Sequence, residues 1–167
     1  MLRKRWRYLL PLALIIVLVP ACAAQPTEEP ETVVITDYNL EAAIRAALDK
    51  TPDEPISAEE LAGLTELKAN YANIADLSGI EHCPNLSKLD LAYNQLVDLS
   101  PLASLDNLER LNLDRNQVSD IAPLPGNSGL GEGDQVDLKN NNLDLSENSE
   151  DMADIRQLEG RGVKVYY

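Results

Sequence analysis

The chain of 167 residues has no phenylalanine, and aromatic residues make up only 4% of it. A core of clustered aromatic side chains is therefore excluded, so Leu, Ile, Val and Ala must fill the interior. Basic residues are also few, because 14 Lys and Arg stand against 28 Asp and Glu, for a formal charge of −14. Binding to nucleic acid or to anionic headgroups needs clusters of Lys and Arg. The composition therefore argues against both of these partners.

Long hydrophobic runs are lacking as well. The run from Leu9 to Val19, interrupted only by Pro11, follows a basic segment at residues 3–7. As a helix it rises about 16 Å, which is too short for a hydrocarbon core of roughly 30 Å. We therefore expect a signal peptide at residues 1–21 rather than a membrane span. Without that segment the chain has 10 basic and 28 acidic residues, a formal charge of −18.

The signal segment ends in the tetrapeptide VPAC at residues 19–22. An aliphatic residue, a small residue and a cysteine resemble the lipobox of bacterial lipoproteins, from which Pro20 departs. The resemblance implies that Cys22 is lipidated and anchors an exported protein to the bacterial cell membrane or envelope, facing outside. The alternative is an ordinary signal peptide cleaved near Ala24, which would give a secreted protein. Residues 22–31 are polar and contain proline, as is typical of a flexible tether.

Cysteine and histidine are scarce, since the chain has only Cys22, Cys83 and His82. A bridge between Cys83 and a cysteine in a flexible tether would stabilise the fold little. The neighbouring His82 and Cys83 suggest a catalytic pair, but Cys83 falls in a hydrophobic column of the repeat described next. A small buried side chain is therefore the simpler interpretation. Without a Gly-rich phosphate loop or zinc-type spacing, we predict no enzymatic activity, no metal and no cofactor.

The chain does contain a repeat of 22 residues. Leu64, Leu86 and Leu108 begin three units, and a fourth follows an insertion of three residues within 125–131. Hydrophobic residues recur at positions four, six, eleven, fourteen and seventeen. Alternation over positions four to six predicts one short strand in each unit, and stacked units place these strands side by side. The same register places Val163 and Val165 at positions four and six of a final strand.

Polar columns accompany the hydrophobic ones. Position nine holds the asparagines, whose amides we expect to satisfy backbone groups at the turn after each strand. These are Asn94, Asn116 and Asn141. Pro101 and Pro123 fix φ where the chain returns on the other side. Position thirteen holds Asp76, Asp98 and Asp120, spaced about 4.8 Å apart along a line, which suits turn capping better than calcium binding.

The pattern LxxLxLxxNxL, followed by DL and PL, resembles the leucine-rich repeat family, particularly the 22-residue internalin-like class of bacterial surface proteins. The resemblance covers about residues 33–167. It implies an α/β fold, a leucine-rich repeat solenoid. Such a solenoid has a short curved parallel β-sheet, a convex side of loops or 3₁₀ turns, a helical N-terminal cap and a C-terminal cap of a helix and a strand. It also implies ligand binding on the concave face without catalysis.

Helix start signals lie at both ends of the repeat region. Asp37 is an expected N-cap, Ser57 and Glu60 match a capping box, and Ser149 precedes another helical pattern. We therefore expect one domain at 32–167, with caps at 32–63 and 146–167 around repeats at 64–145.

The candidate binding residues are the outward side chains of the strands and the residues that follow them. The candidates are Glu66, Lys68, Tyr71, Lys88, Asp90, Tyr93, Arg110, Asn112, Arg115 and Asp137. Interfaces favour Tyr and Arg, so the best of them are the two tyrosines and two arginines. For the last strand the register gives Gly162 at position three and Lys164 at position five. The alternative is a solvated sheet face with cross-strand charge pairs.

We therefore expect a monomeric, non-catalytic module of the cell envelope that recognises an unidentified protein, or a glycan, through its concave face. The alternative is a structural lipoprotein associated with carbohydrate or the cell wall. Stacked aromatic side chains would favour sugar binding, but the few tyrosines do not decide between the two.

Overall fold

The computed structural model describes residues 32–167. The expected signal peptide, the lipidation site at Cys22 and the tether lie outside the described residues. From residue 32 onward, none of the helices is both long enough and apolar enough to cross a membrane.

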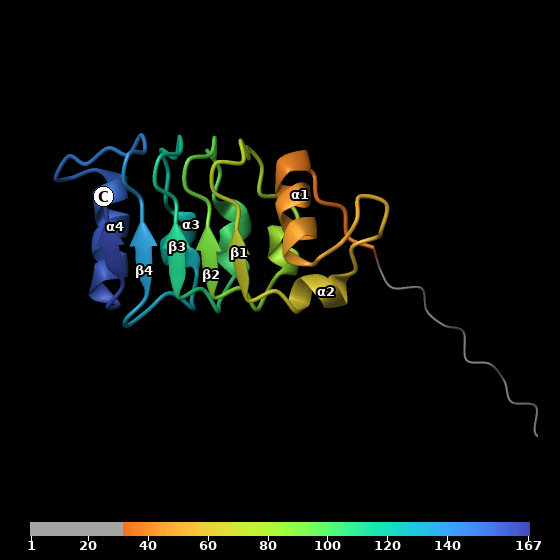
Figure 1. Cartoon of the computed structure of the whole chain (residues 1–167). Helices are drawn as coiled ribbons and strands as arrows, with labels where there is room; N and C mark the ends of the chain where they lie inside the picture. The colour runs from red at the N-terminus through yellow and green to blue at the C-terminus, as the bar shows by residue number, and fades with distance from the viewer. Residues whose placement is uncertain (1–31) are drawn as a thin grey trace, which may run out of the picture.

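Five short strands form one parallel sheet in chain order (Figure 1). They are β1 (Glu66–Lys68), β2 (Lys88–Asp90), β3 (Arg110–Asn112), β4 (Gln135–Asp137) and β5 (Lys164–Tyr166). In the first four strands the position-four residues pair in register, from Leu67 through Leu89 and Leu111 to Val136. The predicted 22-residue register is therefore confirmed for these four units, including the one that follows the insertion.

The return side of each unit is a short helical turn. Two units use 3₁₀ helices, η1 (Ile80–His82) and η2 (Ser100–Ser104), and the third uses a short α-helix, α3 (Pro123–Gly126). Pro101 and Pro123 both lie in the first turn, where a missing N–H costs nothing. The predicted convex side of loops and 3₁₀ turns is thus confirmed, with α3 as a variation at the insertion.

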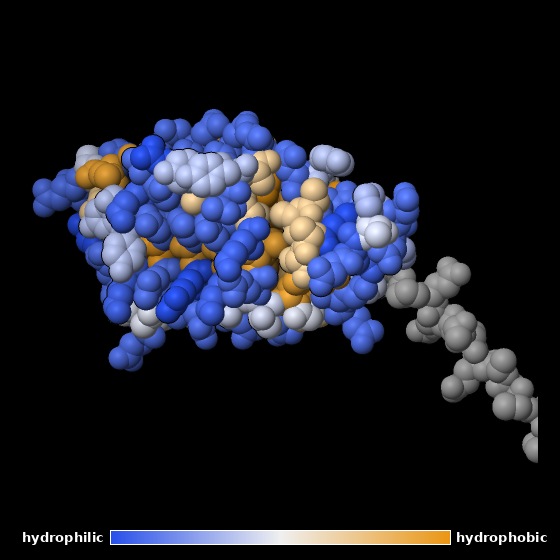
Figure 2. Space-filling model, viewed as in Figure 1, coloured by the Kyte–Doolittle hydropathy of each residue, from blue (hydrophilic) through white to orange (hydrophobic). Residues whose placement is uncertain are grey.

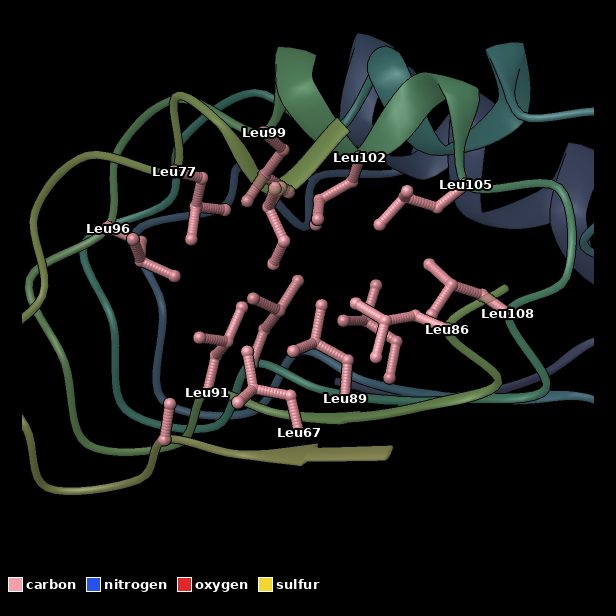
Figure 3. Close-up of a cluster of buried hydrophobic side chains, with 14 of the residues drawn as sticks. Leu67, Leu77, Leu86, Leu89, Leu91, Leu96, Leu99, Leu102, Leu105 and Leu108 are labelled. Carbon is pink, nitrogen blue, oxygen red and sulfur yellow. The ribbon is translucent and has the colours of Figure 1, made fainter. Parts of the chain in front are cut away.

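The core lies between the sheet and these turns (Figure 3). Leu67, Leu89 and Leu91 point inward from the sheet toward Leu99 and Leu102 of the return side. All of these side chains are at most 2% exposed and belong to one continuous cluster. Fully burying a leucine contributes about 1.5–3 kcal/mol, so aliphatic columns suffice without aromatic residues.

Two helices close the N-terminal end: α1 (Tyr38–Ala47) and α2 (Ala58–Ala62). Asp37 caps α1, as predicted, because its Oδ1 accepts hydrogen bonds from the amides of Asn39 and Leu40. Its Oδ2 accepts from the amides of Ala75 and Asp76 in the first repeat. One carboxylate thus starts the helix and joins the cap to the solenoid.

The predicted capping box of α2 is also confirmed. The Ser57 hydroxyl accepts from the Glu60 amide, and the Glu60 carboxylate accepts from the Ser57 amide. Lys50 donates to the same carboxylate at 2.5 Å. The hydrogen bonds from Lys50 and Ser57 lower the pKa of Glu60 to about 2.

The C-terminal end is closed by α4 (Glu150–Gly160) and β5, with Ser149 capping the helix as predicted. The predicted register of the last strand is wrong by two residues, because Val136 pairs with Val165 and not with Val163. The amides of Gly162 and Val163 instead bond the last carbonyls of α4. Gly162 has φ 91°, and a Cβ there would lie 2.9 Å from the Cα of Glu132. The strand therefore begins at Lys164.

The insertion is held by Asn127, which the repeat columns did not single out. Its side chain is fully buried and donates to the carbonyls of Leu102 and Leu105. Its Oδ1 accepts from the amides of Gly129 and Leu130. The three extra residues are thus fixed to the neighbouring repeat by one buried amide.

Candidate functional site

The side of the sheet opposite the core is open, since the helices lie behind the sheet or at its ends (Figure 1). We call this side the concave face, meaning the side chains at positions three, five, seven and eight of each unit. Figure 2 shows it as mostly hydrophilic, with a narrow hydrophobic band beneath the polar groups and an apolar stretch over α1.

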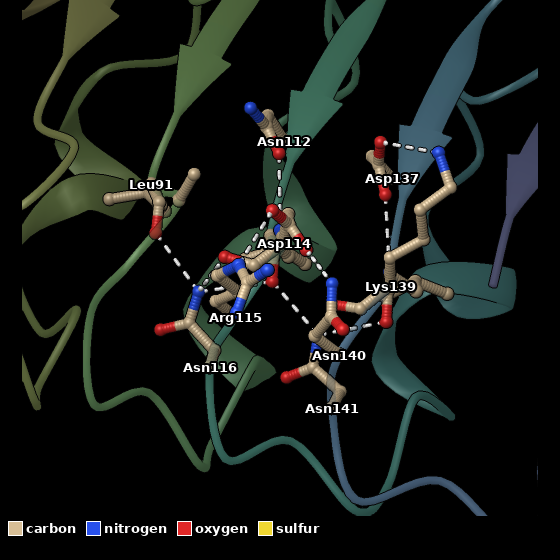
Figure 4. A network of polar contacts seen from close by, with 12 residues as sticks. Leu91, Asn112, Asp114, Arg115, Asn116, Asp137, Lys139, Asn140 and Asn141 are labelled. Atoms are coloured by element: carbon tan, nitrogen blue, oxygen red, sulfur yellow. Dashed lines mark hydrogen bonds and ion pairs between the residues drawn. The ribbon is translucent and has the colours of Figure 1, made fainter.

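The asparagine column builds the turn that ends each strand (Figure 4). The Oδ1 of Asn94 accepts from the amides of Ala72 and Ile74, and its Nδ2 donates to the carbonyls of Ala69 and Leu91. The other two members, Asn116 and Asn141, make corresponding bonds. The predicted role of this column is confirmed.

Position eight of each unit has a left-handed backbone, which sequence reasoning missed. Tyr71, Tyr93, Arg115 and Asn140 have φ of 57°, 57°, 55° and 54°. This conformation costs an ordinary residue about 1–2 kcal/mol, whereas asparagine tolerates it. Asn140 was the one sequence signal available. The conformation recurs in all four units, so the turn of the repeat imposes it on position eight even where Tyr or Arg stands there.

The position-eight side chains of the first three units form a continuous stack. The rings of Tyr71 and Tyr93 lie 4.0 Å apart at 18°, and the guanidinium of Arg115 lies 5.1 Å from the centre of the Tyr93 ring. We call Tyr71, Tyr93 and Arg115 the aromatic stack. Tyr71 is 65% exposed and Tyr93 is 39% exposed. The structure therefore brings together three of the four best candidates at one edge of the concave face.

In β2, β3 and β4 the position-five residue ends the strand and caps the turn that follows. The side-chain oxygens of Asp90, Asn112 and Asp137 each accept from the amide two residues ahead, at 3.1–3.2 Å. These three candidates therefore have a structural role, which the sequence pattern did not reveal.

The remaining candidates are Glu66, Lys88 and Arg110 at position three and Lys68 at position five. Glu66 pairs with Lys68 of the same strand at 2.9 Å. The hydrogen bond between these two side chains lowers the pKa of Glu66 and raises the pKa of Lys68. Lys88 and Arg110, directly opposite each other on β2 and β3, have no ion pair within residues 32–167.

The aspartate column caps turns, as predicted. Asp76 and Asp98 accept from the amide and hydroxyl of the serine two residues ahead, and Asp120 accepts from the amide of Ala122. Over the described range, no three His, Cys, Asp or Glu side chains are grouped in a way that could hold a metal ion.

His82 and Cys83 do not form a catalytic pair. Cys83 is completely buried, as its column predicts, whereas His82 is exposed. Burial raises the pKa of the Cys83 thiol to about 12. A buried thiol that stays protonated at neutral pH is not a nucleophile.

Comparisons with known proteins agree with this geometry. The family model "Leucine Rich repeats (2 copies)" matches residues 62–104 and 84–126. A search of curated proteins gave no match. The structure is similar to an internalin (inlF) of Listeria monocytogenes, with 26% identity and a TM-score of 0.66 over 85% of this chain and 46% of that one.

An internalin C2 of the same organism is similar over 83% of this chain and 69% of that one, with 22% identity and a TM-score of 0.55. The chain thus spans about half of the length of the first of these two internalins. The matched repeats, the in-register parallel sheet and these structural neighbours establish that the chain has the leucine-rich repeat fold of bacterial internalins.

Proposed function

We propose that this protein is a non-catalytic binding module of the bacterial cell envelope that recognises another protein through its concave face. The observation that carries the proposal is the aromatic stack. It presents exposed Tyr and Arg side chains, the types enriched at interface hot spots, from a strained backbone on a rigid sheet. The fold supplies the extended binding surface that solenoids use.

Stacked aromatic side chains are the feature expected of sugar binding, and Tyr71 and Tyr93 are stacked, but the geometry of this stack favours a protein. Sugars bind the free faces of aromatic rings, but here Tyr71 and Tyr93 cover each other and Arg115 covers the far side of Tyr93. Only the outer face of Tyr71 remains free within the stack. What the stack mainly offers is ring edges, hydroxyl groups and one guanidinium, which suit polar contacts with a protein.

The test is a pull-down from envelope extract with the chain from residue 23 onward, which contains the whole described core and both caps. The double variant Tyr71→Asn, Tyr93→Asn removes both rings and keeps a residue type that accepts the left-handed backbone, as Asn140 does. We expect the double variant to keep its fold and to fail to capture a protein that the unaltered chain captures. Tyr38→Asn is the control, because Tyr38 is 80% exposed on α1. Equal capture by all three proteins would contradict the proposal.

Anchoring through lipidated Cys22 is part of the proposal and rests on the sequence at residues 19–22. Two or more acyl chains give durable attachment, whereas one chain is marginal. Cys22→Ala should therefore move the full chain from the membrane fraction to the soluble fraction, measured by fractionation and immunoblotting. Membrane retention of this variant would exclude the lipid anchor.

A further inference from the structure

The basic side chains of residues 32–167 are used very unevenly. There are 10 of them against 25 acidic side chains, so ion-pair partners are abundant. Five are in ion pairs: Arg45, Lys50, Lys68, Arg115 and Lys139. Arg156 and Arg161 donate to backbone carbonyls. The other three, Lys88, Arg110 and Lys164, make neither kind of contact within the described range.

These three residues lie in one row of the sheet. The row starts at Glu66, which pairs in register with Lys88. Lys88 pairs in turn with Arg110, Arg110 with Gln135, and Gln135 with Lys164. The part from Lys88 to Lys164 carries the basic side chains. We call the four residues of this part the basic row. Neighbouring strands are about 4.8 Å apart, so the row spans roughly 14 Å. Like charges directly opposite each other destabilise a sheet, so the arrangement does not serve the fold.

The charge of the concave face differs in sign from that of the rest of the protein. The face carries six basic and four acidic side chains, and the other residues of the range 32–167 carry four basic and 21 acidic ones. All four acidic groups of the face are already engaged. Glu66, Asp114 and Asp137 are in ion pairs, and Asp90 caps a turn. Glu66 also lies opposite Lys88 and interacts with its charge, so Arg110 and Lys164 are the members of the basic row that have no acidic neighbour in register among the described residues.

We propose that the basic row binds an extended acidic segment of the partner protein, laid across the strands. This inference rests on the proposed function, whose partner it describes. Side chains at alternate positions of an extended chain point the same way and repeat every 6.6–6.8 Å or so, and three of them span about 13–14 Å. A segment with Asp or Glu at alternate positions therefore matches the length of the row.

A hollow beside the row would receive such a side chain. It has a volume of about 220 Å³ and is lined by Arg110, Leu111, Asn112, Gln135, Asp137 and Tyr166. The carboxylate of Asp137 is paired with Lys139 at 3.3 Å, which leaves Arg110 as the unpaired charge of the hollow within residues 32–167. A guanidinium binds a carboxylate through two parallel hydrogen bonds, and Gln135 supplies a further N–H donor in the same row. The carboxylate opposite Arg110 is thus the contact that fixes the segment.

The test measures fluorescence anisotropy of a labelled peptide of alternating Ser and Glu, with alternating Ser and Gln as the control peptide. A salt concentration of about 0.1 M gives a Debye length near 10 Å, which screens the distant acidic surface. The variant Lys88→Gln, Arg110→Gln is compared with Lys50→Gln, Arg156→Gln. Both remove two positive charges, but only the first changes the concave face.

We expect the Glu peptide to bind the unaltered protein and the Gln peptide not to bind. The row variant should weaken binding about tenfold or more, and the control variant less than about threefold. Equal loss in both variants, or no binding of the Glu peptide, would overturn the proposal. Binding of oligogalacturonate in place of the peptide would also overturn it, in favour of a carboxylated glycan.

The same variants separate this proposal from the proposed function. If the row variant still captures the envelope partner while the Tyr71→Asn, Tyr93→Asn variant does not, the concave face is supported as the binding site. The proposed role of the basic row is then refuted. If the tyrosine variant also captures the partner fully, the proposed function itself fails.

Discussion

Replacing Asn116 by alanine is the sharpest test of the asparagine column. Its side chain accepts a hydrogen bond from the amide of Leu96 at 3.0 Å and donates to the carbonyls of Leu91 and Leu113 at 2.9 and 3.0 Å. Asn116 is only 7% exposed, so water cannot readily replace these bonds. The substitution therefore removes three hydrogen bonds made with buried backbone groups.

The three losses are not equal. The carbonyls of Leu91 and Leu113 keep a second donor, because Asn94 and Asn141 bond them at 2.9 and 2.8 Å. The amide of Leu96 keeps no partner. A buried unpaired group costs about 1–3 kcal/mol, and each lost hydrogen bond contributes about 0.5–1.5 kcal/mol. We therefore expect the free energy of unfolding to fall by about 2–4 kcal/mol.

Urea denaturation followed by circular dichroism measures this change, with the chain from residue 23 onward. In a domain of this size the melting temperature should fall by roughly 7–14 °C. Asn107→Ala is the matched control, because Asn107 is exposed and makes one bond, to the carbonyl of Pro84. The control should lose no more than about 0.5 kcal/mol. Equal losses for the two variants would refute the view that buried amides hold the turns.

Two further predictions concern the core and the N-terminal cap. Leu111→Ala should lower the free energy of unfolding by about 2–5 kcal/mol, because Leu111 is only 3% exposed in the central strand. Urea denaturation measures this change, and an unchanged midpoint would contradict the register. Burial raises the pKa of Asp37, but hydrogen bonds from four backbone amides outweigh it and hold the pKa below 3.8. Asp37 thus contributes stability above pH 4 or so, and this stability is lost as the pH falls through the lowered pKa. Acid titration of stability should therefore show a smaller loss for Asp37→Asn than for the unaltered protein, and equal losses would exclude this role.

Much of the fold could be predicted because local sequence patterns that recur in each repeat determine it. Leu at positions four and six marks each strand, and the same columns recur after the insertion, so the stacking order follows directly. The caps could be predicted equally well, since Asp37, Ser57 and Ser149 accept hydrogen bonds from amides two or three residues ahead. Such signals depend only on neighbours in the chain.

The last strand shows where the local pattern stops being sufficient. Side chains of a strand alternate with period two, so a shift of two residues leaves Val163 and Val165 on the same side of the sheet. The hydrophobic pattern therefore fits both registers equally well. Only the packing of Gly162 against Glu132, and its bond to the end of α4, decides between them.

For the concave face, too, some features could be predicted from the sequence and others only from the structure. The sequence determined which side chains point outward, because a strand alternates with period two. Only the tertiary structure showed that Tyr71 and Tyr93 stack, that Asp90 caps a turn and that Arg110 has no ion-pair partner between residues 32 and 167. Each of these facts depends on which residues of neighbouring repeats meet across the strands, and on a left-handed backbone that Tyr and Arg do not favour. Repetition thus dictates the solenoid, while contacts between repeats decide what its open face can bind.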